Sequence, residues 1–216
     1  MTAPRNAVIN SGEELTPASA TVDARTSPKM NKQKKIPGEA GVWIFILGDM
    51  SVFAVFFTYY LVQRSKQPEL FDASQATLNK SFGAVNTVFL LISSLFVVLA
   101  VRAIRSAQRP LAQRLVIAAF LCGIAFVLVK IFEYHERIAA HQTPSVNNFY
   151  LLYFVLTGLH LFHLVIGLVV LIVLRSMATK PDLSQGQWAF FEGGACFWHM
   201  VDALWLVLFP LIFLVR

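Results

Sequence analysis

The chain has 216 residues, of which 56% are hydrophobic and only 14% are charged, and its mean hydropathy is +0.62. A water-soluble domain of this length could not hide so large an apolar fraction in one core, so the composition excludes that class and requires the lipid bilayer as part of the solvent. The net charge of +6 comes from basic residues in the N-terminal tail and at the ends of apolar runs. This distribution indicates membrane topology rather than a nucleic-acid partner.

Residues 1–39 form a polar tail that is rich in Ser, Thr, Pro, Asn and charge and that ends in a basic stretch before Pro37. Such a segment cannot bury enough apolar surface to fold, so we predict a disordered cytoplasmic tail over 1–39. The first apolar run extends from about Gly41 to Val62. It begins too late and is too long for the apolar part of a cleavable signal peptide, and it therefore predicts a retained helix.

Five apolar stretches follow the tail, and each is long enough to cross a hydrocarbon core of roughly 30 Å as a helix. In lipid the backbone must satisfy its own hydrogen bonds, so runs of this length indicate helices rather than open strands. The predicted fold class is therefore all-α, an integral membrane bundle of five transmembrane helices within one domain, residues 40–216. The expected helices cover approximately 41–62, 83–104, 115–134, 149–174 and 190–215.

The basic residues also predict an orientation, because Lys and Arg collect on the cytoplasmic side of a membrane. The tail, the segment 102–114 and the pair Arg175 and Lys180 lie on one side and together hold twelve of the 18 basic residues. Long tails are weak determinants of topology, so the compact cluster in 102–114 carries most of the weight. We predict the amino terminus inside and the carboxyl terminus outside.

Several ionisable or imidazole side chains fall inside the predicted spans, where each is costly unless it faces protein or water. Lys130 and Glu133 are three residues apart, a spacing that places them on one helix face and allows an ion pair. Asp49, next to the small residue Gly48, should face the bundle. The complete set of buried polar candidates is Asp49, Lys130, Glu133, His160, His163, His199 and Asp202.

Two interpretations compete for these residues. In the first, they form hydrogen bonds between helices and fix the packing, an effect of about 1 kcal/mol each in membranes. In the second, the histidines are haem or metal ligands, which requires further ligands from other helices, and the carboxylates of Asp49 and Glu133 move protons. We take interhelical bonding as the expectation and assign no catalytic, cofactor-binding or metal-binding residue.

The remaining chemistry of the sequence supports that assignment. Cys122 and Cys196 lie far apart within apolar runs, a pattern that suggests neither a disulfide framework nor a zinc site. The chain has no His-Glu-x-x-His zinc motif and no phosphate-binding loop.

Read in order, the polar landmarks of residues 37–216 resemble subunit III of haem-copper oxidases. The run 197–205 resembles the Trp-His-Phe-Val-Asp-x-x-Trp element of that family, with Met200 in place of Phe. The segment 157–163, followed by a glycine at 167, resembles the Thr-Gly-x-His-x-x-His element, and 130–134 resembles the Glu-Tyr element. Asp49 stands where most members carry a glutamate that is associated with carbodiimide labelling, and an aspartate there shortens the reach of the carboxylate.

The resemblance narrows further to a short form of the family. Five helices instead of seven match the form that lacks the first two helices. The opening run 38–45 and the pairs Asn86-Thr87 and Ser93-Ser94 are similar to the NorE-type branch, which accompanies nitric oxide reductases in denitrifying bacteria.

The resemblance implies a non-catalytic accessory subunit of the bacterial inner membrane that packs against the catalytic subunit of a haem-copper oxidase or nitric oxide reductase. It implies that the chain holds phospholipid, supports assembly and is linked to proton supply, and that haem and copper are bound only by the partner. Two alternatives stay open: a small proton- or ion-coupled transporter that uses Asp49, Glu133 and Asp202, and a membrane haem or quinone protein that acts alone.

Overall fold

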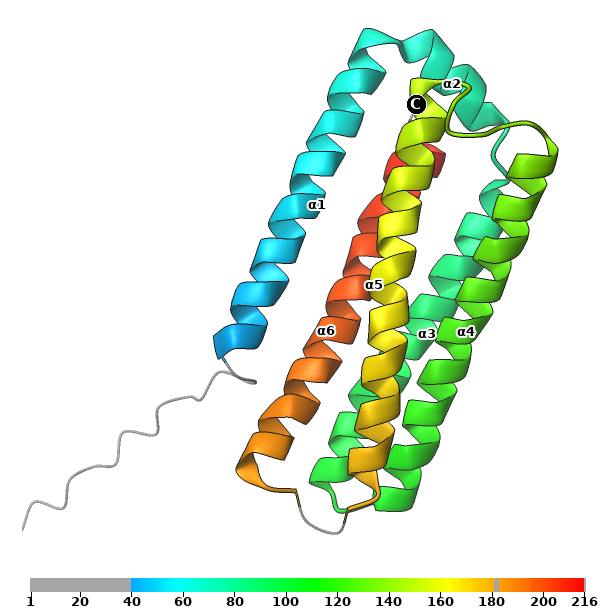
Figure 1. Cartoon of the computed structure of the whole chain (residues 1–216). Coiled ribbons are helices and arrows are strands. Elements are labelled where there is room, and N and C mark those ends of the chain that lie inside the picture. Colours follow the sequence, from blue (N-terminus) through cyan, green and yellow to red (C-terminus); the bar gives the residue numbers. More distant parts are fainter. Residues whose placement is uncertain (1–39, 181–182, 216) are drawn as a thin grey trace, which may run out of the picture. The chain divides into compact units, whose positions relative to one another are not determined.

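The computed structural model describes residues 40–180 and 183–215, which form helices and connecting turns without a β-strand in these ranges (Figure 1). The long helices are α1 (Ala40–Lys66), α3 (Lys80–Arg105), α4 (Arg109–Ala139), α5 (Asn148–Ala178) and α6 (Gln185–Phe209). The short elements are α2 (Pro68–Ala76) and the π-helix η1 (Pro210–Leu214). Five helices of the described chain, the last of them counted through η1, are long and apolar enough to cross a membrane. The predicted all-α membrane bundle is confirmed, whereas the predicted tail 1–39 lies outside the described residues.

The helices extend further than the predicted ranges, which is a correction to the sequence-based boundaries. The helix expected from 115 begins at Arg109, and the helix expected from 190 begins at Gln185. Hydropathy marks the hydrocarbon layer, whereas capping side chains mark the helix ends. The α6 start is a capping box, in which the Ser184 hydroxyl accepts from the Gln187 N–H at 3.3 Å and the Gln187 side chain accepts from the Ser184 N–H at 3.1 Å.

The connector between the first two spans contains α2, a helix that the sequence analysis did not predict. Its start follows from Pro68, whose missing N–H is tolerated in the first turn, and from the acidic Glu69 in that turn. Its apolar anchor is Phe71, which is fully buried with its ring centroid 5.5 Å from those of Tyr60 and Phe149. α2 therefore ties the end of α1 to the start of α5.

The last span was expected as one continuous helix to 215, but its end changes to π-helical geometry. Pro210 has no backbone N–H and cannot donate to the carbonyl of the preceding turn. The chain continues as η1 with wider turns, and the Val215 N–H donates to the Pro210 carbonyl at 2.9 Å.

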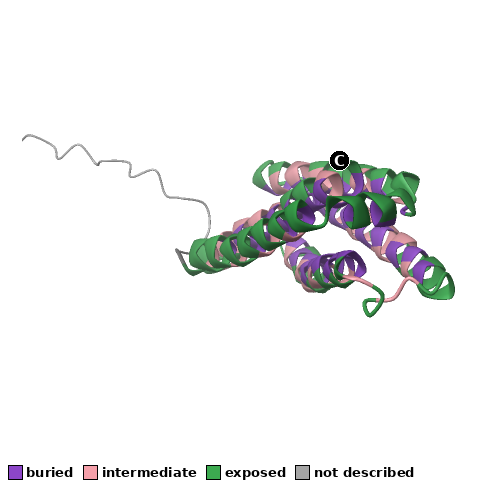
Figure 2. Cartoon of the chain, turned by 90° about the horizontal axis from the view of Figure 1, so that it is seen from above, coloured by how far each residue is buried: buried purple, intermediate pink, exposed green. Residues whose placement is uncertain are grey.

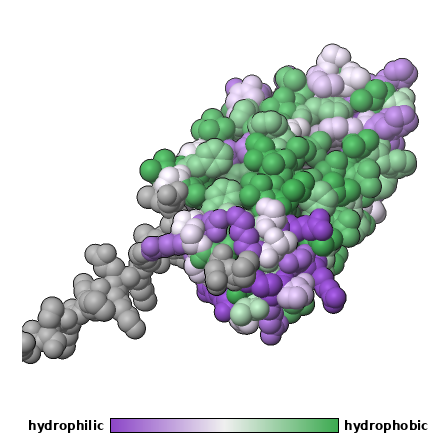
Figure 3. Space-filling model, turned by 60° about the horizontal axis from the view of Figure 1, so that its bottom comes forward, coloured by the Kyte–Doolittle hydropathy of each residue, from purple (hydrophilic) through white to green (hydrophobic). Residues whose placement is uncertain are grey.

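The helices differ strongly in how much surface the bundle covers. α6 is the most buried span and packs mainly on α5 and α3, whereas α1 is the least buried and makes its main contacts with α6, α5 and α2. Figure 2 shows α1 exposed along most of its length. Since the flank of the bundle is apolar and the hydrophilic residues gather at an end (Figure 3), these exposed side chains are suited to lipid or to another membrane protein.

The two ends of the bundle carry different charge. The start of α1, the α3–α4 connection and the α5–α6 connection lie at the same end (Figure 1), which places the 102–114 cluster and Arg175 together. The 102–114 cluster and Arg175 thus share one end of the bundle, as the predicted topology requires. The orientation in the membrane stays a prediction.

Trp198 of α6 joins four helices at the centre of the core. Its ring is fully buried and fills the gaps left by Gly123 of α4 and Gly167 of α5, where an added Cβ would lie 2.9 Å and 2.8 Å from ring atoms. Its indole N–H donates to the Ser93 hydroxyl of α3 at 3.1 Å, and that hydroxyl donates to the Ala119 carbonyl of α4 at 3.0 Å. The absence of a side chain at both glycines is therefore a packing requirement.

We expect Gly167→Ala to lower the free energy of unfolding in mild detergent by about 1–3 kcal/mol, because the new methyl group overpacks a buried ring. The matched control is Gly158→Ala on the same helix, where an added Cβ meets only the Tyr134 hydroxyl at 3.9 Å. Denaturant titration of both variants checks the prediction. Equal stabilities for the two would contradict the assigned role of Gly167.

Candidate functional site

The most deeply buried charges are Lys130 and Glu133 of α4, which the sequence spacing predicted as a pair. Lys130 Nζ lies 2.9 Å from Glu133 Oε2, and both side chains are almost completely shielded from solvent. The other carboxylate oxygen, Oε1, accepts the hydroxyl proton of Tyr153 at 2.6 Å. Both oxygens of the buried carboxylate therefore have partners, which is the condition for a stable ion pair in a medium of low dielectric constant.

Four aromatic rings surround the Lys130 ammonium. Its Nζ lies 5.1 Å from the ring centroids of Tyr153 and Trp205, 5.6 Å from that of Tyr134 and 5.7 Å from that of Phe213. The negative faces of such rings attract a cation, and the attraction is stronger where water is excluded. Because these rings belong to α4, α5, α6 and η1, the single ammonium links four elements. We name this group, Lys130, Glu133, Tyr134, Tyr153, Trp205 and Phe213, the lysine cage.

A second set of polar groups borders the lysine cage on α5. The Thr157 hydroxyl donates to the Tyr153 carbonyl at 2.6 Å, so the Tyr134 hydroxyl, 2.6 Å from Thr157 Oγ1, acts as the donor of that bond. His160 is fully buried between the rings of Phe126 and Trp205, with centroid distances of 5.6 Å and 5.2 Å. Neither of its nitrogens has a hydrogen-bond partner in the described part of the chain, so its visible contacts are those of a packing side chain.

Asp49 and His163 form the polar contact between α1 and α5. His163 Nε2 lies 2.9 Å from Asp49 Oδ1, and His163 Nδ1 lies 2.7 Å from the Leu159 carbonyl. A carbonyl oxygen can only accept, so Nδ1 carries a proton. His163 Nε2 then faces the Asp49 carboxylate, and this contact joins α5 to α1 within the membrane. His160 faces other helices, so the structure does not join His160 and His163 in one site.

The third cluster lies between α3 and α6. His199 Nδ1 is bonded to the Ser94 hydroxyl at 2.8 Å, whereas it lies 4.0 Å from Asp202 Oδ2. The Asp202 carboxylate is buried, and neither of its oxygens receives a well-formed hydrogen bond from a described residue. The spacing of His199 and Asp202 thus brings them together, but the interhelical bond of His199 is made with Ser94.

Sequence reasoning missed three hydroxyl partners on α3. The Thr87 hydroxyl accepts from the Trp205 indole at 3.0 Å, Ser93 accepts from Trp198, and Ser94 bonds His199. Trp198 and Trp205 are seven residues apart and therefore lie on one face of α6, which was the available signal, and their partners Ser93 and Thr87 are six residues apart on α3. The Asn86-Thr87 and Ser93-Ser94 pairs had been interpreted only as features of a family branch.

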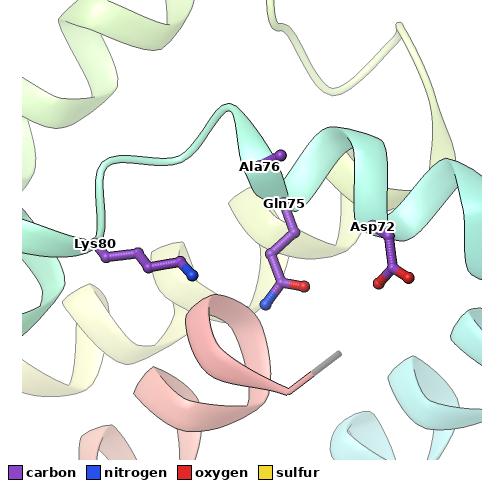
Figure 4. A pocket seen from close by; sticks show the side chains of 4 residues that line it. All are labelled: Asp72, Gln75, Ala76 and Lys80. Carbon is purple, nitrogen blue, oxygen red and sulfur yellow. The ribbon is translucent and has the colours of Figure 1, made fainter.

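Two of the hollows on the described bundle contrast in chemistry. An apolar cleft of about 420 Å³ lies between α1, α5 and α6, lined among others by Val42, Phe45, Val170 and Gly194. A second, polar pocket of about 260 Å³ is lined by Asp72, Gln75, Ala76 and Lys80 (Figure 4). The Gln75 amide is buried without a hydrogen-bond partner among the described residues, which makes this pocket suited to water.

Within residues 40–180 and 183–215, no group of three His, Cys, Asp or Glu side chains is placed to hold a metal ion. Cys122 and Cys196 are both free thiols. Several polar side chains of the described bundle bond across helices, as Trp198 does with Ser93 and Tyr153 with Glu133, so these bonds define contacts between helices. That this chain binds no haem or metal of its own stays a prediction.

The fold and its buried clusters define a five-helix integral membrane protein. Residues 24–215 match the family described as cytochrome c oxidase subunit III, and the chain belongs to this family. This confirms the resemblance seen in the sequence, while membership of the NorE-type branch stays a prediction.

Relatives in that family cover most of the chain. Subunit 3 of the cytochrome bo(3) ubiquinol oxidase of Buchnera aphidicola is 26% identical over 192 residues, 89% of this chain and 92% of the relative. Subunit 3 of the cytochrome c oxidase of Synechocystis is 28% identical over 175 residues, 81% of this chain and 74% of the relative. The probable quinol oxidase subunit 3 of Staphylococcus haemolyticus is 24% identical over 196 residues, 90% of this chain and 94% of the relative. Quinol and cytochrome c oxidases are both represented, so these names do not select an electron donor.

We expect Glu133→Gln to destabilise the bundle by about 3–5 kcal/mol, because it leaves the Lys130 ammonium buried without a counter-charge. The double variant Lys130→Met with Glu133→Gln should recover most of the loss, since it removes the uncompensated charge. The free energies of unfolding of the two single variants and the double variant, measured in detergent, form the test. Additive losses would show that the pair is not coupled.

Proposed function

We propose that this chain is the non-catalytic third subunit of a haem-copper oxidase of the bacterial inner membrane. The observation that carries the proposal is the family match over residues 24–215, combined with the polar landmarks quoted from the sequence. The relatives named above are subunits of quinol and cytochrome c oxidases. In this proposal, the catalytic subunit binds the haem and copper, and this chain supports its assembly.

The proposal includes a bound phospholipid. The apolar cleft between α1, α5 and α6 opens on the lipid-facing flank and is lined by glycines and by large apolar side chains, including Phe45 and Phe190. A flexible acyl chain suits such a cleft, because it contributes apolar surface and requires no hydrogen-bond partner. The lipid would fill the space between the loosely packed α1 and the other helices.

The proposal also includes a part in proton supply for Asp49 and His163. Asp49 Oδ1 and His163 Nε2 lie 2.9 Å apart within membrane spans, where a neighbouring carboxylate and imidazole that could pass a proton between them are rare. The finer assignment to a NorE-type subunit of a nitric oxide reductase system rests on the sequence patterns at 38–45, 86–87 and 93–94. Identification of the catalytic subunit that accompanies this chain distinguishes a nitric oxide reductase system from an oxygen-reducing oxidase.

The decisive experiment is a mild-detergent pull-down of the tagged chain from its native membrane, with an absorption spectrum, protein mass spectrometry and lipid analysis of the recovered material. We expect a haem-containing catalytic subunit and retained phospholipid. An unrelated multi-pass protein with the same tag is the control. A colourless chain recovered without a partner would overturn the proposal and favour the small transporter.

We expect Asp49→Asn to lower steady-state turnover of the assembled complex severalfold at unchanged haem content. The amide preserves the size of the side chain and its contact with His163, but it cannot take up and release a proton as a carboxylate does. Glu136→Gln is the matched control, because that carboxylate is half exposed at the end of α4. Turnover per assembled complex is the measurement, and unchanged turnover in the Asp49 variant would restrict the pair to a structural role.

A further inference from the structure

His199 occupies an unusual position for a polar residue in a membrane protein. It lies near the midpoint of the span Gln185–Leu214, and its side chain is 34% exposed on the outside of the bundle. Its Nδ1 is held by Ser94, which itself lies near the midpoint of α3. No residue in the described ranges forms a hydrogen bond with its other nitrogen, Nε2.

Unlike the nitrogens of His160, which the bundle encloses, His199 Nε2 faces outward, where hydrocarbon offers no partner and an unsatisfied polar group costs several kcal/mol. Other exposed polar side chains in the middle of the described spans find a partner within their own helix. The Ser51 hydroxyl donates to the Leu47 carbonyl at 2.7 Å, and the Thr58 hydroxyl donates to the Ala54 carbonyl at 2.8 Å. His199 has no such arrangement for Nε2.

The outer surfaces of the neighbouring helices contrast with this position. In the same layer, the most exposed side chains of α4 and α5 are apolar and include Leu121, Leu128, Phe162 and Val165. Lipid alone can cover such apolar surfaces. The surface around His199 differs from them because it exposes a polar imidazole.

The surroundings of His199 would allow a further helix to approach closely. On α6 the small residues Cys196 and Ala203 lie one turn before and one turn after it, and all three are at least partly exposed. On α3, Leu91 is exposed one turn before Ser94. Small residues on both sides of a polar one are typical of contacts between membrane helices.

We infer that this surface, defined by Leu91, Ser94, Cys196, His199 and Ala203, is the docking face for a transmembrane helix of the catalytic subunit. That helix carries a hydrogen-bonding side chain opposite His199 Nε2. If Nδ1 accepts from Ser94, Nε2 is an N–H group and requires an acceptor; the other tautomer requires a donor. A hydroxyl or carboxamide side chain satisfies both cases. The inference rests on the proposed function, because that function supplies the partner.

Photo-crosslinking from the intact complex tests the location of the face. A photoreactive phenylalanine derivative is placed at Leu91 or Ala203 on the proposed face, and at Leu128 or Val165 as matched exposed controls. We expect crosslinks to the catalytic subunit from the first two positions and none from the controls. Co-purification with crosslinks only from the control positions would overturn this inference and leave the proposed function intact. Failure of the unmodified chain to recover a catalytic subunit would overturn both.

Substitution of His199 tests the hydrogen bond itself. We expect His199→Phe, which keeps a ring but removes both nitrogens, to reduce the catalytic subunit retained during detergent titration by about three- to tenfold. His199→Gln should restore much of the retention, and His135→Phe, at an exposed position outside the face, should leave it unchanged. Size-exclusion profiles confirm that each variant is folded. Equal retention for folded His199→Phe and the unmodified chain would overturn the inferred hydrogen bond.

Discussion

Polar groups inside hydrocarbon have no water to bind, and this constraint determines how the helices are arranged. The clearest result is the contact between α3 and α6, where Thr87, Ser93 and Ser94 bond Trp205, Trp198 and His199 in turn. Apolar side chains alone could slide past one another by a helical turn with little change in contact with lipid. The bonds of Trp198 and His199 at one level and of Trp205 about two turns away fix the register of the two helices.

The same constraint explains the unequal charge of the two bundle ends. Several basic residues at the end that carries α2 are buried and bonded. Arg64 binds Asp72 at 2.7 Å and the Val215 carbonyl, and Arg137 donates to the Thr77 carbonyl at 2.6 Å. Lys130 is enclosed in the lysine cage. These cations bond one element to another inside the protein. Fewer unpaired basic residues are therefore left at this end than the sequence count suggests, and the difference in basic charge between the two ends, on which the predicted orientation depends, is larger.

The sequence predicted what depends on local pattern. Hydropathy located five spans, and the three-residue spacing placed Lys130 beside Glu133, because both signals operate within one helix. The partners of these residues were not predictable in the same way. Tyr153 meets Glu133, and Asp49 meets His163, only after α5 has packed against its neighbours, and no local period records that contact. The π-helical turn at Pro210 was likewise not predictable, because it depends on which N–H group, here that of Val215, donates to the Pro210 carbonyl.

Asp49 shows how packing can change the meaning of a substitution. In the sequence, the aspartate at this position shortens the reach of the carboxylate relative to the glutamate of most family members. In the structure its carboxylate nevertheless lies 2.9 Å from His163 Nε2, because the partner side chain comes from the adjacent α5 and extends toward α1. The contact depends on the distance between the carboxylate and the imidazole, which is set by the position of His163 as well as by the length of the Asp49 side chain. Since α1 has few other contacts with the bundle, this bond also contributes to holding the helix in place.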